Sequence, residues 1–439
     1  MRLGVNQIAM IYYAAGLLLM KGISLLMLPV LTHLLAPREY GQLEVLLTII
    51  NLGSLILGFG LVDALYRFAG MAADEGERKQ VVARVFGLVW IIALASLVLL
   101  WWLAPLVQRL LPTETRLADV RWVLSALPFE GVIGVPLAWL RMRNQARLFF
   151  VATAGKAVIQ SLLTAWWLWL GWGVSGVLAS GTLTCVGLAL LLSLWQWRDG
   201  GIRFDWQYYR PLLRYGMPLV VSGLAGFALS GLDRWLLAEH VGEALLAYYA
   251  VAGKLALAVG LLLQPFALWW YPRRFMLLKE PDGLRLNAHY SVLGSVLGFA
   301  TAGVVGLTAP LLIRWLTPES YHGAIAYIPL LVLGMAVRNV SDLLNVGCFS
   351  GEESKAQMVI NLGCSLLGVL GFLLAIPRFG VAGVIWTLLL VYLVRALAFY
   401  LVSQRLLPLP YRLSALWASG AGSLAMMWLG QWWAGQWAA

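Results

Sequence analysis

The sequence predicts an all-α polytopic membrane protein with two six-helix transmembrane bundles around a central cavity. Of the 439 residues, 61% are hydrophobic and only 12% are charged, whereas soluble domains are near half apolar and a quarter charged. Apolar runs of about 20 residues, the length of a membrane-spanning helix, recur along the whole chain. The basic residues gather in alternate loops between these runs, which is typical of a chain that crosses a bilayer repeatedly.

The first apolar run is too long for a signal-peptide core and is followed by many similar runs, so it is predicted to be a transmembrane helix. Twelve spans are predicted: 9–32, 43–66, 84–108, 121–140, 148–171, 173–195, 212–237, 245–271, 289–316, 325–350, 356–376 and 381–407. Residues 413–437 form one more apolar stretch. It is either a thirteenth span or a Trp-rich helix lying in the membrane interface.

Six spans precede residue 200 and six follow it. The predicted domains are therefore an N-terminal bundle (1–200), a C-terminal bundle (201–408) and an apolar C-terminal segment (409–439). Segments 29–41 and 233–250 each place a helix end, a His and a short polar turn before a Tyr and another helix. Parallel repeats of this kind put a cavity between two bundles that can rock against each other. Chance similarity of helix–turn–helix segments is the alternative.

The orientation follows from the basic residues. With the N-terminus in the cytoplasm, the inside loops hold nineteen Lys and Arg residues and the outside loops hold seven. This bias predicts a cytoplasmic N-terminus. It also explains the net charge of +11 as a topology signal, so no nucleic-acid partner is predicted.

The sequence gives little indication of an enzyme active site, a metal site or a cofactor-binding site. The three cysteines lie within apolar runs without CxxC spacing, and the four histidines are scattered without ligand spacing. The sequence has no Walker-type phosphate loop, and no loop is long enough for a folded catalytic domain. The chain is therefore predicted to need no cofactor or metal and to act within the membrane, not as an enzyme.

Charged residues within the predicted spans are the candidate functional groups. Each costs about 2.5–3.5 kcal/mol at bilayer depth, so they are expected to face a hydrated cavity or to pair with one another. The candidate substrate-binding cations are Lys21, Arg338, Arg395, Lys156 and Lys254. The candidate ion-coupling carboxylates are Glu130, Asp342, Asp63 and Asp233.

The basic excess at depth predicts an anionic cargo such as a phosphate or pyrophosphate, which Arg binds bidentately and Lys binds as a point charge. Glu130 is the first candidate for a protonatable coupling group because desolvation favours its neutral form. The structural alternatives are a carboxyl that only packs helices, an Arg338–Asp342 pair at i, i+4 spacing, and lysines such as Lys156 and Lys254 that reach the headgroups.

Three segments resemble the polysaccharide-transport branch of the multidrug/oligosaccharidyl-lipid/polysaccharide exporters. The first runs from Leu28-Pro29 through His33 to Tyr40-Gly41, although an Arg is commoner in the family where His33 stands. The second contains Tyr215-Gly216-Met217-Pro218, then Asp233-Arg234, and Tyr248 to Lys254. The third contains Asn361-Leu362-Gly363, Ile376-Pro377-Arg378-Phe379-Gly380 and Gly383. Each motif is degenerate, and the specificity comes from their joint order along nearly the whole chain.

The resemblance implies a bacterial inner-membrane flippase that moves undecaprenyl-pyrophosphate-linked oligosaccharide repeat units to the periplasmic leaflet by alternating access. It implies surface polysaccharide biosynthesis, O-antigen or exopolysaccharide, with membrane lipid and H⁺ or Na⁺ as further partners. Polymerase and export proteins of the same pathway are candidate partners too. The main alternative is a cation-coupled multidrug antiporter of the same superfamily, and its expected buried carboxylates are outnumbered here by basic residues.

Overall fold

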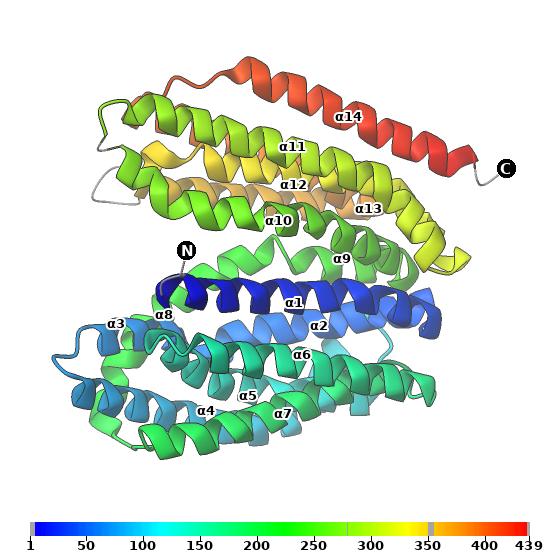
Figure 1. Cartoon of the computed structure of the whole chain (residues 1–439). Coiled ribbons are helices and arrows are strands. Elements are labelled where there is room, and N and C mark those ends of the chain that lie inside the picture. The colour runs from blue at the N-terminus through cyan, green and yellow to red at the C-terminus, as the bar shows by residue number, and fades with distance from the viewer. Residues whose placement is uncertain (1–4, 279, 350–354, 437–439) are drawn as a thin grey trace. The chain divides into compact units, whose positions relative to one another are not determined.

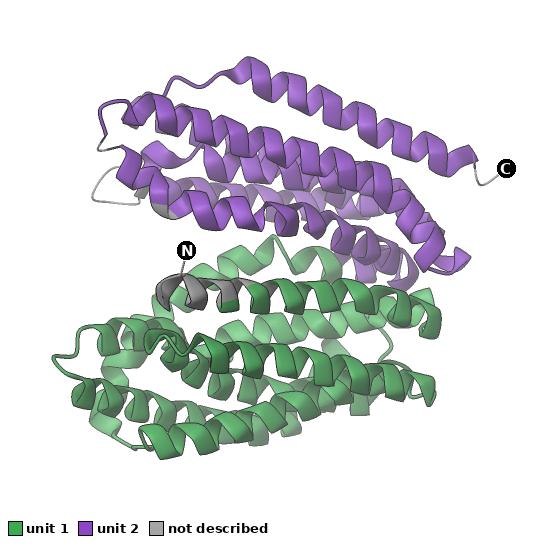
Figure 2. Ribbon diagram, viewed as in Figure 1, with its two compact units in different colours: residues 1–235 green, residues 236–439 purple. Residues whose placement is uncertain are grey.

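The computed structural model describes residues 5–278, 280–349 and 355–436. Within these ranges all assigned secondary structure elements are helices (Figure 1), which confirms the predicted all-α class. The chain forms two compact units (Figure 2): unit 1 is Met1–Trp235 and unit 2 is Leu236–Ala439. The domain limits at residues 200 and 408, which came from counting spans, stay a prediction.

Unit 1 consists of long helices joined by short turns. They are α1 (Val5–Leu34), α2 (Pro37–Gly58), α3 (Leu61–Gly70), α4 (Glu75–Leu110), α5 (Leu117–Met142), α6 (Ala146–Trp169), α7 (Gly173–Asp199) and α8 (Trp206–Ala228). The next helix, α9 (Leu232–Val241), contains the boundary between the units. These helices occupy the predicted spans.

Unit 2 has the same character. Its elements are α10 (Glu243–Leu277), α11 (Gly283–Leu316), the 3₁₀ helix η1 (Glu319–Tyr327), α12 (Ile328–Leu343), the 3₁₀ helix η2 (Val346–Phe349), α13 (Lys355–Leu406) and α14 (Leu413–Gln436). In the described part of the chain, nine helices are long and apolar enough to cross a membrane, or ten if the bent pair α8–α9 counts as one span. A polytopic membrane protein is thus confirmed, while the count of twelve stays a prediction.

Helix α13 is a hairpin of two antiparallel arms. Its backbone breaks at Gly380, where φ is 56°, a left-handed conformation that favours glycine. A Cβ on Gly371 would overlap the Thr387 side chain, and one on Gly383 would overlap the Ala375 carbonyl oxygen. Glycines on both sides of the break therefore let the arms pack closely, so α13 supplies two of the predicted spans.

The C-terminal helix α14 lies alongside α11 (Figure 1). Glycines of α11 contact α14 in register, since Gly303 faces Met426 and Gly306 faces Met427. Near the far end of α14, the Gln431 amide donates to the carbonyl oxygen of Ile325 in η1, at 2.8 Å. The helix follows the length of α11, but α14 is not among the helices of the described chain that are long and apolar enough to cross a membrane, so the choice between a thirteenth span and an interfacial helix stays open.

Replacing Gly430 with alanine is expected to destabilise unit 2 by about 1–3 kcal/mol. A Cβ there would lie 2.6 Å from the Gly306 carbonyl oxygen and 2.8 Å from Leu307 Cα, so backbone would have to move. In the matched control Gly422→Ala, the new Cβ meets nothing within 4 Å, and alanine favours a helix. Thermal unfolding in detergent measures both variants. Equal melting temperatures would show that α14 does not pack as described.

The basic loops of unit 1 meet at one end of that unit. Arg143, at the end of α5, contacts Asp199 at 2.5 Å and Glu75 at 3.7 Å, and Arg84 contacts Asp205 at 3.1 Å. These pairs join the start of α4, the end of α5, the end of α7 and the loop before α8. The alternation of basic and non-basic loops predicted from the sequence therefore corresponds to two opposite ends of the unit.

Helices α2 and α3 are separated by a short break that α8 crosses. Phe59 and Gly60 both have positive φ, 47° and 61°. A Cβ on Gly216 of α8 would overlap the Phe59 carbonyl oxygen. The glycine of the Tyr215-Gly216 motif therefore allows backbone to approach backbone within unit 1.

Candidate functional site

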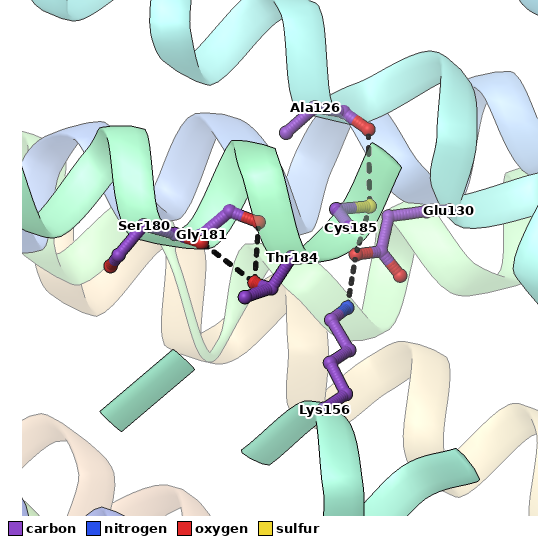
Figure 3. Close-up of polar contacts among 7 residues, drawn as sticks. All are labelled: Ala126, Glu130, Lys156, Ser180, Gly181, Thr184 and Cys185. Atoms are coloured by element: carbon purple, nitrogen blue, oxygen red, sulfur yellow. Dashed lines mark hydrogen bonds and ion pairs between the residues drawn. The ribbon is translucent and has the colours of Figure 1, made fainter. Parts of the chain in front are cut away.

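The polar cluster of unit 1 joins α5, α6 and α7 (Figure 3). Lys156 Nζ lies 3.2 Å from Glu130 Oε1, and Cys185 Sγ lies 3.5 Å from the same oxygen. The Lys156 and Glu130 side chains are 22% and 37% exposed. Lys156 and Glu130 therefore form an ion pair, which is the structural alternative to a role in cargo binding or ion coupling. Each charge lowers the cost of holding the other at bilayer depth.

The Thr184 hydroxyl group, which lies near this pair, forms its hydrogen bonds within its own helix. Thr184 Oγ1 donates to the carbonyl oxygens of Ser180 at 2.7 Å and Gly181 at 3.1 Å (Figure 3). Such bonds to the preceding turn are common for Thr in membrane helices. The charged groups of this cluster are Glu130 and Lys156.

The polar cluster of unit 2 is centred on Arg395, in the second arm of α13. Its Nη2 lies 2.9 Å from Asp342 Oδ1, and its Nε donates to Asn361 Oδ1 at 3.0 Å. Its Nη1 donates to Ser341 Oγ, and the guanidinium lies 4.9 Å from the centroid of the Phe399 ring. Three helical segments therefore orient a guanidinium that is 17% exposed.

Arg338 belongs to the same cluster but does not form the i, i+4 pair considered from the sequence. Its guanidinium lies 6.0 Å from the centroid of the Tyr392 ring, one turn before Arg395, and its side chain is exposed. Asp342 pairs with Arg395 instead. The cluster thus holds two arginines and one carboxylate, which leaves an excess of one positive charge.

The other predicted site residues are distributed over α1, α3, α9 and α10. Asp233 is buried, and Arg234 lies 3.6 Å from it and 3.3 Å from Glu44 on α2. Lys21 on α1 and Asp63 on α3 are exposed, and Lys254 on α10 is half-buried. The structure therefore joins Glu130 with Lys156, and Arg338 with Asp342 and Arg395.

Sequence reasoning missed two groups of polar residues. Glu44 lies in the first turn of a predicted span and is 4% exposed, and its position in that span was the available signal. Arg274 was assigned to a loop but is 7% exposed. Arg274 Nη1 donates to Asn345 at 3.0 Å, and its guanidinium lies 4.7 Å from the centroid of the Phe275 ring. Hydropathy gave no sign that α10 extends far enough to bury it.

Solved structures share this fold over almost the whole chain. A structure described as "Lipid II flippase MurJ, inward closed conformation" matches with a TM-score of 0.73, over 96% of this chain and 92% of that chain, at 12% identity. An inward-facing multidrug resistance MATE family transporter of the MOP superfamily matches with a TM-score of 0.60, over 91% and 96%, at 16% identity. This chain therefore shares the all-helical fold of these two proteins.

The sequence comparisons place the chain in a family. Residues 30–267, which are 238 of the 439 residues, match the model of the polysaccharide biosynthesis protein family, and the chain belongs to this family. A relative is the succinoglycan biosynthesis transport protein ExoT of Rhizobium meliloti (strain 1021), 26% identical over 241 residues. That match covers 54% of this chain and 46% of ExoT, so it spans less than half of the relative's length. The resemblance read from the motifs is confirmed.

Proposed function

We propose that this protein is a flippase that carries lipid-linked oligosaccharide repeat units from the cytoplasmic to the periplasmic leaflet for surface polysaccharide biosynthesis. The family points to polysaccharide biosynthesis as the pathway, and the fold shared with a flippase points to transport as the mode of action. The observation that carries the proposal is the Arg338–Asp342–Arg395 cluster, which places an excess positive charge within a helical bundle. Such a site is suited to the pyrophosphate of an undecaprenyl-linked sugar.

The proposed location is the bacterial inner membrane with a cytoplasmic N-terminus, because the basic loops then lie inside. The proposed cargo contacts are Lys21, Arg338, Arg395, Lys156 and Lys254. The proposed coupling groups for H⁺ or Na⁺ are Glu130, Asp342, Asp63 and Asp233. Transport by alternating access would bring cations from both units to the cargo in turn.

The test is to delete the gene and measure which leaflet holds the lipid-linked oligosaccharide, together with the amount of surface polysaccharide. We expect the intermediate to accumulate on the cytoplasmic leaflet, with rescue by the wild type and not by a variant with Lys21, Arg338 and Arg395 replaced by alanine. The matched control replaces the exposed Arg109, Arg116 and Arg378 and should rescue. Normal surface polysaccharide without a trapped intermediate, in a strain that has no second flippase, would favour the drug antiporter.

A further inference from the structure

The three nitrogen atoms of Arg395 have partners that differ in access to solvent. Ser341 is fully buried, whereas Asn361 is half-buried and the Asp342 side chain is 35% exposed. A guanidinium has five N–H donors, and the contacts of Arg395 with Asn361, Ser341 and Asp342 use three of them. Two N–H groups, one on each terminal nitrogen, remain beside the bond to Asp342.

The cluster of Arg395 lies where an anionic cargo could reach it from the basic end of unit 2. Arg395 precedes the end of α13 at Leu406 by eleven residues, which is about 16 Å of helix. Its partner Asn361 follows the start of α13 by six residues, about 9 Å. The guanidinium therefore lies inside the span, in the half nearest to Arg405 and Arg412, the end predicted to be cytoplasmic.

We propose that Asp342 is an exchangeable ligand of Arg395, which the phosphate of an anionic lipid cargo displaces, while Asn361 and Ser341 keep the guanidinium in place. A carboxylate and a phosphate both accept parallel hydrogen bonds from a guanidinium, so they compete for the same donors. Asp342 is the charged one of the three partners and its side chain is 35% exposed, so it can leave the guanidinium without becoming a buried, unpaired carboxylate.

Exchange would make the site selective for a strongly charged group. A ligand must supply more favourable contacts to Arg395 than the Asp342 carboxylate that it displaces. Arg338, beside Tyr392, adds a second positive charge that attracts a pyrophosphate. A sugar without phosphate gains neither contact. This inference rests on the proposed flippase function and names the step by which the cargo is recognised.

A phosphate could come from the cargo or from a phospholipid headgroup, and binding measurements separate these sources. The probe is farnesyl pyrophosphate, a short polyprenyl pyrophosphate, added to the full-length protein in phosphatidylcholine nanodiscs. Asp342→Asn is expected to bind it about tenfold tighter, a gain of about 1.4 kcal/mol, because the competing charge is gone. Arg395→Gln is expected to bind at least about tenfold more weakly for the opposite reason.

Two further variants separate binding from folding. The double variant Asp342→Asn/Arg395→Gln removes both charges of the Arg395–Asp342 pair together, so it should keep the wild-type melting temperature and still bind weakly. Arg378→Gln removes an exposed arginine from the first arm of α13 and should bind as the wild type does. Unchanged or weaker binding by Asp342→Asn would overturn the exchange.

The remaining outcomes distinguish the sources of phosphate and the two levels of the proposal. If phosphatidylglycerol in the nanodisc competes with the probe in the wild type but not in Arg395→Gln, the headgroup is the ligand and the cargo assignment is wrong. A wild type that binds and flips, with unchanged binding by Asp342→Asn, would overturn the exchange alone. A wild type that neither binds the probe nor flips a lipid-linked oligosaccharide would overturn the flippase function itself.

Discussion

Replacing Gly216 with valine is expected to destabilise unit 1 by at least about 3 kcal/mol. Its Cβ would overlap the carbonyl oxygen of Phe59, and Gly60 Cα lies only 3.4 Å from the same point. These are backbone atoms, so no side chain can rotate away to make room. The break between α2 and α3 would have to separate from α8, with loss of the packing around it.

The matched control for this variant is Gly226→Val in the same helix, because a Cβ on Gly226 meets nothing within 4 Å. Yield of folded protein after detergent extraction and the melting temperature measure the difference. Gly226→Val should change stability only by the small helix propensity difference between the two residues, which favours valine. Equal yields and melting temperatures for the two variants would mean that α8 does not cross the α2–α3 break as described.

Replacing Lys156 with methionine is expected to destabilise unit 1 by about 2.5–3.5 kcal/mol, the cost of an uncompensated charge at bilayer depth. The variant leaves the Glu130 carboxylate in contact with the Cys185 thiol but without a cation beside it. The double variant Glu130→Gln/Lys156→Met should recover most of the loss, since no charge remains. Melting temperatures of the wild type, both single variants and the double variant form the cycle.

The same cycle tests whether Glu130 couples transport to an ion gradient. If it does, the folded double variant should lose gradient-driven flipping. Arg78→Met, a replacement of an exposed residue in the first turn of α4, should keep both stability and flipping. Gradient-driven flipping by the double variant at the wild-type rate would show that the Glu130–Lys156 pair only holds α5 and α6 together.

Much of the fold could be predicted because hydropathy is a local property. Each helix that crosses the bilayer must be apolar along its own length and satisfies its own backbone hydrogen bonds, so the predicted spans fall on helices, although the spans 43–66 and 212–237 each contain a break between two helices. The break at Gly380 was also marked in the sequence, by the Phe379-Gly380 and Gly383 pattern. The reason for that pattern, close packing of the two arms of α13, was not.

The candidate site was predicted less well, because ion pairing depends on contacts between helices. Spacing along α12 suggested that Arg338 neutralises Asp342, but the structure pairs Asp342 with Arg395, 53 residues further along the chain. Glu130 and Lys156 were considered separately, and only the packing of α5 against α6 brings them to 3.2 Å. The sequence did identify the right residue types, since a charge in an apolar span needs a partner wherever that partner lies.

By itself, then, the sequence determined the membrane class, the approximate positions of the helices, the end of unit 1 that carries the basic loops and the family. All of these depend on residues close together in the chain or on ordered motifs. The tertiary structure alone decided which charges meet, that α14 lies along α11, and which glycines allow backbones to touch. Those features depend on how each helix is rotated about its axis and placed beside its neighbours, which no run of consecutive residues specifies.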